Sequence, residues 1–207
     1  TVYRASIAGD DASAASCESK WYIGKPGQFE FQSSGQNGLY ISSDADAARA
    51  VYTANSLSGY RVLTYCDMTL DAGHYSLIFS WRANGREANS RLYVYWVPQT
   101  TQIWSDPASA QMIPLWGRNG GMNLVPTPDG CLYGEKAWQG QRLEFDITEQ
   151  NKEGRLLFIW SCNHDTPLPP SACIDDIVLY SSQPNCEALP ISFNARRDQG
   201  CFWSCKS

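Results

Sequence analysis

Apolar side chains recur at every second position along most of this chain, and this period of two is the feature that most constrains its fold. The segment 74–84 (HYSLIFSWRAN) places Tyr75, Leu77, Phe79 and Trp81 on one face of an extended strand. A β-strand points successive side chains to opposite faces, whereas a helix repeats every 3.6 residues. The segment therefore predicts a strand with one face in a core.

The same alternation predicts further strands on both sides of that segment. They are expected at residues 38–42, 49–53, 61–70, 90–97, 142–147, 156–160 and 172–180. Gly, Asn, Asp and Pro separate these segments, as in KPG, SGQNG and PTPDG, and such residues favour turns. Only 10–20 and 44–49 are compatible with a helix, and both are short. We therefore expect an all-β antiparallel β-sandwich of two packed sheets.

Two parts of the chain interrupt the strand pattern. Residues 98–140 form a long connection with three tryptophans and the run GRNGG, and loops of this length within a domain are often functional. Around residue 182, SSQPNCEALP has the composition of a linker. We therefore place the sandwich, with its long loop insertion, at residues 1–182. Residues 183–207 are expected to be a linker with a short C-terminal extension, or the start of a following domain.

The composition excludes several classes of protein. The chain is 43% hydrophobic and 13% aromatic but only 18% charged, unlike a disordered chain or a solvated helical bundle. The net charge is −5 and the sixteen basic residues are scattered, so we expect no nucleic-acid partner. No apolar run is long enough to span a bilayer, so no membrane insertion is expected. The chain starts at Thr1 without a signal-peptide pattern, and we interpret it as one module of a larger chain.

Eight cysteines suggest disulfides in an oxidising compartment. None has Cys-x-x-Cys spacing, which removes the strongest zinc and redox patterns. Cys162 and Cys173 bracket a loop at the ends of two strands, and their thiols could meet if those strands are neighbours. Cys201 and Cys205 are candidates to pair across a tight turn. Cys66 lies mid-strand and is expected to be a buried apolar residue.

The most distinctive sequence segment of the chain is 156–180, LLFIWSCNHDTPLPPSACIDDIVLY. It resembles the cleaved-adhesin, or choice-of-anchor, domain of secreted bacterial adhesins and gingipain-type haemagglutinins, which is related in fold to MAM domains. The matching positions are Trp160, Asn163, Asp165, Pro169, Pro170, Ile174, Asp175, Asp176 and Ile177. KWYIG (20–24), GLYISSD (38–44) and YSLIFSWRANG (75–85) resemble other elements of that family in the same order. The N-terminal strand that usually precedes them is hard to find in residues 5–19.

The resemblance implies a jelly-roll sandwich at an extracellular or cell-surface location, which binds host proteins, haem proteins or sugars. It also implies calcium as a structural ion. Asp175 and Asp176 are adjacent on a predicted strand, so their carboxylates are expected to face apart, and an inward one needs a partner. Calcium takes about six to eight oxygen ligands, and Asp44 and Asp165 are candidates to complete its shell. The alternative is that one carboxylate is solvated and the other caps a turn.

Aromatic side chains in the long connection are the candidate ligand-binding residues. Aromatic rings stack on the apolar faces of sugars, and neighbouring polar side chains can bind hydroxyl groups. The candidates are Trp104, Trp116, Tyr133 and Trp138, with Arg118 and Asn119. The alternative is that the loop folds over the sandwich and these tryptophans form a satellite core. Trp81, Trp96 and Trp160 belong to strand patterns and are expected in the main core, and Trp21 is a candidate for it too.

Catalysis has little support in the sequence. His74 and His164 are the only histidines, and no Gly-x-Ser-x-Gly motif is present. Carboxylates that face apart cannot act together on a glycosidic bond. We therefore expect no enzyme but a secreted adhesion module that recognises a host protein or a glycan through loops. The alternatives are a carbohydrate-binding module or glycoside hydrolase-associated domain, and a structural spacer.

Overall fold

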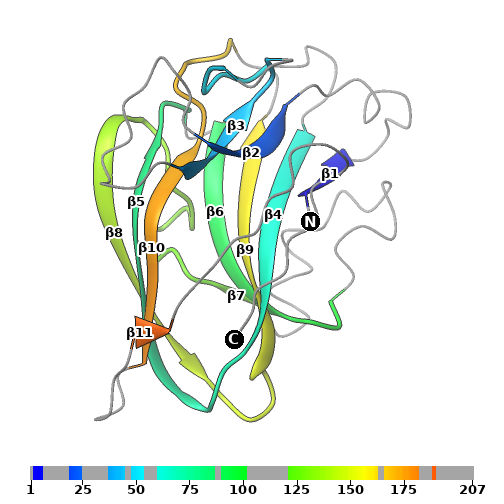
Figure 1. The fold of residues 1–207 in the computed structure, drawn as a ribbon, viewed down its shortest axis with the longest axis vertical. Helices are drawn as coiled ribbons and strands as arrows, with labels where there is room; N and C mark the ends of the chain where they lie inside the picture. Colours follow the sequence, from blue (N-terminus) through cyan, green and yellow to red (C-terminus); the bar gives the residue numbers. More distant parts are fainter. Residues whose placement is uncertain are drawn as a thin grey trace.

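The computed structural model describes residues 2–6, 19–24, 37–44, 48–53, 60–86, 90–101, 121–162, 166–181 and 188–189. These residues form an all-β antiparallel sandwich, and the part of the chain that the structure describes contains no helix (Figure 1). It follows that no helix in these ranges is long and apolar enough to span a membrane. The predicted fold class is confirmed.

The sandwich has two sheets, here called sheet A and sheet B, in which every pair of neighbouring strands is antiparallel. Sheet A has the order β1 (Val2–Ser6), β4 (Tyr60–Thr69), β9 (Glu153–Cys162), β6 (Ser90–Pro98) and β7 (Met122–Asn123). Sheet B has the order β2 (Lys20–Gly24), β3 (Gly38–Ser42), β10 (Cys173–Ser181), β5 (Gly73–Ala83) and β8 (Glu135–Ile147), with β11 (Ala188–Leu189) paired to β10.

The main core lies between the inner faces of the two sheets. The predicted core tryptophans Trp21, Trp81, Trp96 and Trp160 are all there, each no more than 5% exposed. Aromatic rings also meet across the gap between the sheets, as Phe79 of β5 packs edge-on against Phe158 of β9 at 5.6 Å. Burial of such large side chains is the main stabilising term of a sandwich.

The outer face of sheet A is also apolar. The side chains of Leu157 and Ile159 point away from the main core, as the alternation predicts, yet both are fully buried. They pack with tyrosines of β4 and β6 and with Cys131, and half-buried Tyr133 lies against them. This second cluster explains why β9 reads as a nearly continuous apolar run, which is typical of a strand covered on both faces.

Four parts of the chain differ from the sequence prediction. Residues 49–53 form no strand, and the carbonyl groups of Ala50 and Val51 instead accept hydrogen bonds from the backbone of Ser171 and Ser43. The long connection predicted at 98–140 contains β7 and the first residues of β8, because β8 follows β5 beyond Trp81 through a register shift. The N-terminal strand that the sequence did not reveal is β1, which pairs with β4. Beyond residue 182, Ala188 and Leu189 add β11 to sheet B.

Gly154 of β9 provides a test of the packing between the strands. A Cβ atom at Gly154 would lie 1.9 Å from Cζ2 of Trp96, whose ring is fully buried and donates a hydrogen bond to the Asn151 carbonyl. Overpacking of a core typically costs about 1–3 kcal/mol. We expect Gly154→Ala to lower the free energy of unfolding by about 2 kcal/mol in urea titrations.

Gly140 of β8 is the matched control, since a Cβ atom there would meet nothing within 4 Å. Gly140→Ala is expected to change the free energy of unfolding by less than about 0.5 kcal/mol, as surface substitutions usually do. Equal effects of the two substitutions would contradict the packing of Trp96 against β9.

Candidate functional site

The edge of β10 has a notch where two neighbouring strands stop short of each other. β3 pairs with β10 only at Cys173 and Ile174, and β11 pairs with it only at Leu179 and Tyr180. Among the described residues, no strand pairs with positions 175–178 on that side. Figure 1 shows β3 at one end of β10 and β11 near the other. The regular strand pairing of sheet B is therefore interrupted at the Asp175–Asp176 pair.

A β-bulge lies at the same place. On the other side of β10, Asp175 pairs with Ser80 and Val178 pairs with Ile78, so that two residues, Asp176 and Ile177, stand opposite Phe79. Asp176 has a φ of 52°, in the left-handed region that aspartate tolerates better than most residues. Its N–H donates to Oδ1 of Asp175 at 2.9 Å.

The bulge corrects the prediction that Asp175 and Asp176 face apart. That prediction assumed strict alternation, and an inserted residue with a positive φ breaks the alternation at this point. Both residues consequently line one pocket, which we call the bulge pocket. Its volume is about 260 Å³ and its lining residues are Ile23, Asn37, Gly38, Leu39, Ile174, Asp175, Asp176 and Ile177.

The bulge pocket combines an apolar wall with oxygen acceptors. Ile23, Leu39 and Ile174 are cross-strand neighbours on β2, β3 and β10, which aligns their side chains in one row. The polar lining residues are Asn37, which is exposed, Asp176, which is exposed, and Asp175, which is 7% exposed. A pocket of this kind can hold a ligand with one apolar face and several hydrogen-bond donors.

The pKa of Asp176 depends on its surroundings in the pocket. Burial raises the pKa of Asp176, and the negative charge of Asp175 raises it further. Ser80 opposes the shift, because its hydroxyl donates to Oδ2 of Asp176 at 3.4 Å. A donor from a ligand would stabilise the ionised form of Asp176 in the same way.

Of the predicted calcium ligands, the structure brings Asp175 and Asp176 together in the bulge pocket but leaves Asp44 apart from them. Asp44 follows the end of β3 opposite to the pocket residue Gly38, and both of its oxygens accept hydrogen bonds from Arg49 at 2.7 and 2.8 Å. Asp165 lies outside the described residues. Within the described ranges, no three His, Cys, Asp or Glu side chains form a group that could hold a metal ion. The described residues therefore do not supply the shell that the sequence predicts, and calcium stays a prediction from the family resemblance.

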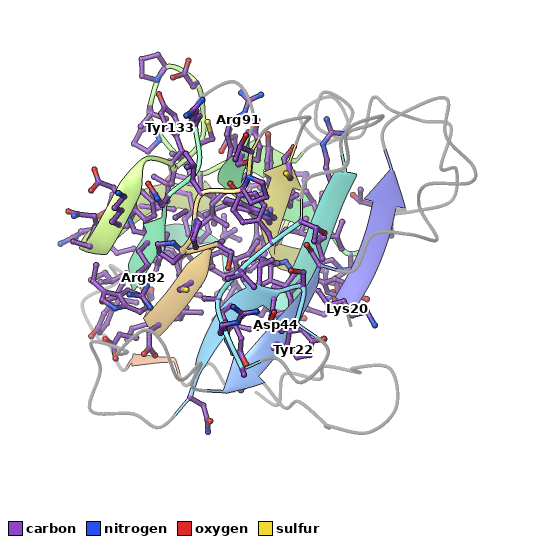
Figure 2. The ribbon with its side chains drawn as sticks, turned by 90° about the horizontal axis from the view of Figure 1, so that it is seen from above. Lys20, Tyr22, Asp44, Arg82, Arg91 and Tyr133 are labelled. Carbon is purple, nitrogen blue, oxygen red and sulfur yellow. The ribbon has the colours of Figure 1, made fainter. Side chains whose placement is uncertain are left out.

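The two described members of the predicted aromatic ligand-binding set, Tyr133 and Trp138, lie on different faces of the sandwich. Trp138 is half-buried on the outer face of sheet B, where it packs against Tyr40 and Cys173 and the Arg82 guanidinium lies over its ring at 4.7 Å. Tyr133 packs on the outer face of sheet A. Figure 2 shows Tyr133 and Arg82 on different sides of the molecule. Trp104, Trp116, Arg118 and Asn119 lie outside the described residues.

The predicted Cys162–Cys173 disulfide is wrong. Neither cysteine forms a disulfide, and both are buried. Cys162 lies in the core on β9 of sheet A, whereas Cys173 lies on the outer face of β10 in sheet B, so that the loop between them connects the two sheets. Cys66 is buried as expected, but it is disulfide-bonded, and Cys201 and Cys205 lie outside the described residues.

The sequence analysis missed an ion cluster on the outer face of sheet B. His74 of β5 contacts Asp146 through Nδ1 at 2.8 Å and Glu144 through Nε2 at 3.0 Å. Glu144 also accepts a hydrogen bond from Ser76 at 2.7 Å and pairs with Arg142. Both ring nitrogens of His74 are thus engaged by carboxylates, and the ring does not contact Ser76 as a catalytic base would. The alternating charges of 142–146 were the signal for this cluster.

The thiols provide a test of the sheet assignment. Burial raises the pKa of Cys173 to about 11, so that little thiolate is present at pH 8. We expect iodoacetamide at pH 8 to leave Cys162 and Cys173 unlabelled in the folded protein. Unfolding without a reductant should allow both to be labelled, as peptide mapping by mass spectrometry would detect. A peptide linked through these two cysteines would contradict the structure.

The ion cluster predicts a pH dependence at His74. Its pKa is raised above 6.5, chiefly by the hydrogen bond to Asp146. The ion pairs are therefore fully formed below pH 6.5 and are lost as the pH rises through the raised pKa. We expect Asp146→Asn to lower the pKa of His74, measured by NMR titration of the imidazole protons.

Glu149→Gln is the control for this titration, because Glu149 pairs with Lys152 instead. It is expected to leave the pKa of His74 unchanged. A His74 that titrates at the same pH in the protein and in Asp146→Asn would show that the cluster does not form.

No protein-family profile and no curated protein matches this chain. Among solved structures, it is similar to the enzymatically active domain of tailspike protein 4 of bacteriophage CBA120, with 8% identity over 86% of this chain and 19% of that chain, at a TM-score of 0.42. It is also similar to TmCBM61 in complex with β-1,4-galactotriose, with 9% identity over 87% of this chain and 88% of that chain, at a TM-score of 0.41. A third is the CBM22-1 xylan-binding domain of Paenibacillus barcinonensis Xyn10C, with 8% identity over 77% and 80%, at a TM-score of 0.40. Function therefore has to be argued from the chemistry of the bulge pocket.

Proposed function

We propose that the chain is a non-catalytic binding module that recognises a glycan in the bulge pocket. The observation that carries this proposal is the pairing of an isoleucine-rich wall with two carboxylates and an asparagine in one pocket of about 260 Å³. A sugar ring has the complementary surface, with an apolar C–H face and a rim of hydroxyl groups. The pocket is slightly smaller than the roughly 300–1,000 Å³ of drug-sized ligand sites, which favours a single ring.

The polar groups of the pocket favour a neutral, hydroxyl-rich ligand. A carboxylate in its ionised form only accepts hydrogen bonds, so exposed Asp176 can accept them from two hydroxyl groups of one ring. Oδ1 of Asp175 already accepts from the Asp176 N–H. Asn37 adds both a donor and an acceptor. An acidic sugar would place its own carboxylate near two others, which is electrostatically unfavourable.

The arrangement of the carboxylates supports binding without catalysis. A glycosidase needs two acids on opposite sides of the scissile bond, about 5–9.5 Å apart. Asp175 and Asp176 are consecutive residues of one strand, joined by the hydrogen bond from the Asp176 N–H. They therefore approach a ligand from the same wall. We therefore propose that the module has no enzymatic activity.

The role we propose is that of an adhesion module in a larger secreted or cell-surface protein. The family resemblance of 156–180 supports this role and the extracellular location. A small concave pocket suits a sugar better than the large flat contact that a host protein requires. The same pocket argues against a purely structural spacer, for which no binding site is needed.

The proposal predicts that Asp176 and Asn37 determine sugar binding. A glycan array would identify the ligand, and calorimetric titration would then compare the protein with Asp176→Asn and Asn37→Ala. Loss of a hydrogen bond to a charged acceptor typically costs about 1.5–3 kcal/mol, so we expect Asp176→Asn to weaken binding roughly 10- to 100-fold. Asparagine tolerates the left-handed backbone of position 176, so that this variant is expected to fold.

Glu149→Gln, on an exposed turn, is the control and should bind the ligand unchanged. If Asp176→Asn and Asn37→Ala both bind the sugar as strongly as the unsubstituted protein does, the sugar binds elsewhere and the proposal is contradicted. Reducing ends released from the bound glycan during the titration would contradict the non-catalytic part.

A further inference from the structure

Two arginines on sheet A have no carboxylate partner among the residues that the structure describes. Each of three other arginines forms an ion pair with a carboxylate, in the pairs Arg49–Asp44, Arg142–Glu144 and Arg155–Asp67. Arg61 of β4 and Arg91 of β6 differ from them. In the part of the chain that the structure describes, no Asp or Glu lies within ion-pair distance of either guanidinium. This is unexpected in a chain with a net charge of −5.

The two arginines converge on one place. In the ladder of sheet A, Arg61 pairs with Ser161 of β9, and Ser161 pairs with Arg91 on its other side. The three side chains share the outer face of the sheet, because their neighbours Val62 and Leu92 lie in the main core. Strands are about 4.8 Å apart, so the two arginine backbones are about 10 Å apart. Two side chains of this length can bring both guanidinium groups to one ligand above Ser161.

Arg91 lies against an aromatic ring, and part of the Arg61 side chain is buried. The Arg91 guanidinium lies over the ring of Tyr93, which is only 6% exposed, at 5.7 Å from its centroid. Nε of Arg61 is buried and has no hydrogen-bond partner. Burial lowers the pKa of Arg61, and the positive charge of Arg91 lowers it further. A buried charged donor without an acceptor is unfavourable. An anion bound there would accept a hydrogen bond from the guanidinium and would reduce the repulsion between the two arginines.

We propose that Arg61, Ser161 and Arg91 form a binding site for an oxyanion, namely a carboxylate or sulfate group of a ligand. The planar fork of N–H donors on a guanidinium matches the oxygens of such a group, and two guanidiniums would hold it from both sides. The Ser161 hydroxyl adds a third donor at the centre of the row. The site lies on the outer face of sheet A, whereas the bulge pocket lies at the edge of sheet B, so that the two proposals are independent.

Asp129 is the carboxylate whose charge reaches this site. It lies on the exposed turn before Cys131 and accepts a hydrogen bond from the Tyr133 hydroxyl at 3.3 Å. Burial raises the pKa of Tyr93, and the charge of Asp129 contributes to that rise. Figure 2 shows Tyr133 and Arg91 on the same side of the molecule. Asp129 should therefore weaken the binding of an anion at Arg91 by electrostatic repulsion.

The experiment is an NMR titration of the whole chain with sodium sulfate, sodium acetate and sodium chloride at equal ionic strength. We expect sulfate or acetate to shift the amide signals of Arg61, Arg91 and Ser161 with saturation, and chloride to leave them unshifted. The stronger of the two oxyanions identifies a sulfated or a carboxylated ligand. Arg91→Gln should weaken the binding at least about tenfold, and Asp129→Asn should strengthen it.

Arg142→Gln is the matched control, because Arg142 is exposed on β8 and paired with Glu144. It should bind the anion unchanged. Arg61→Gln tests the contribution of the buried donor. If this variant fails to fold, Arg91→Gln still decides the result, because Arg91 is only half-buried. Shifts that do not saturate, that chloride reproduces, or that Arg142→Gln reduces as much as Arg91→Gln would overturn the proposal. None of these outcomes depends on whether a glycan binds in the bulge pocket.

Discussion

The packing of large aromatic side chains between the two sheets is the constraint on which the rest of the structure depends. Phe79, Phe158 and Trp160 must all point inward, and a slip of one residue in any strand would turn its apolar face to solvent. The pairing of the strands is therefore fixed wherever these rings meet. An extra residue can be accommodated only where the inner face has room. In β10 that place is the bulge at Asp176 and Ile177, next to the notch between β3 and β11.

The sequence predicts the fold well because alternation reports burial directly. The strand at 38–42 was predicted with the observed bounds, and the inward set of β5 is correct through Trp81. The failures occur where alternation carries no information. Nothing in the text of 172–180 marks the bulge, since Asp176 takes its positive φ only when β5 holds both sides of the strand in register. The segment 49–53 has the composition of a strand but bonds to single backbone groups of its neighbours.

The candidate site was predicted in part for the same reason. The Asp175–Asp176 pair was singled out from the sequence, but the other residues that line the bulge pocket, such as Asn37, Ile23 and Leu39, come from segments far away in the sequence. The Cys162–Cys173 prediction failed because it required the two flanking strands to be neighbours, whereas β9 and β10 belong to different sheets. Cys162 faces the core and Cys173 faces outward from the other sheet.

The bulge pocket and the site at Arg61, Ser161 and Arg91 differ in charge. Carboxylates line the notch of sheet B, whereas Arg61 and Arg91 stand without carboxylate partners among the described residues on sheet A. Under the two proposals, a single acidic sugar would be repelled by the first site and attracted by the second, and a neutral ring would have no counterpart for two guanidiniums. The edge of sheet B and the outer face of sheet A would therefore select different chemical groups. A chain of neutral sugars that carries occasional acidic substituents could satisfy both, but only if it passes around an edge of the sandwich. The separation of the two sites on opposite sheets thus places a length requirement on any ligand that engages both at once.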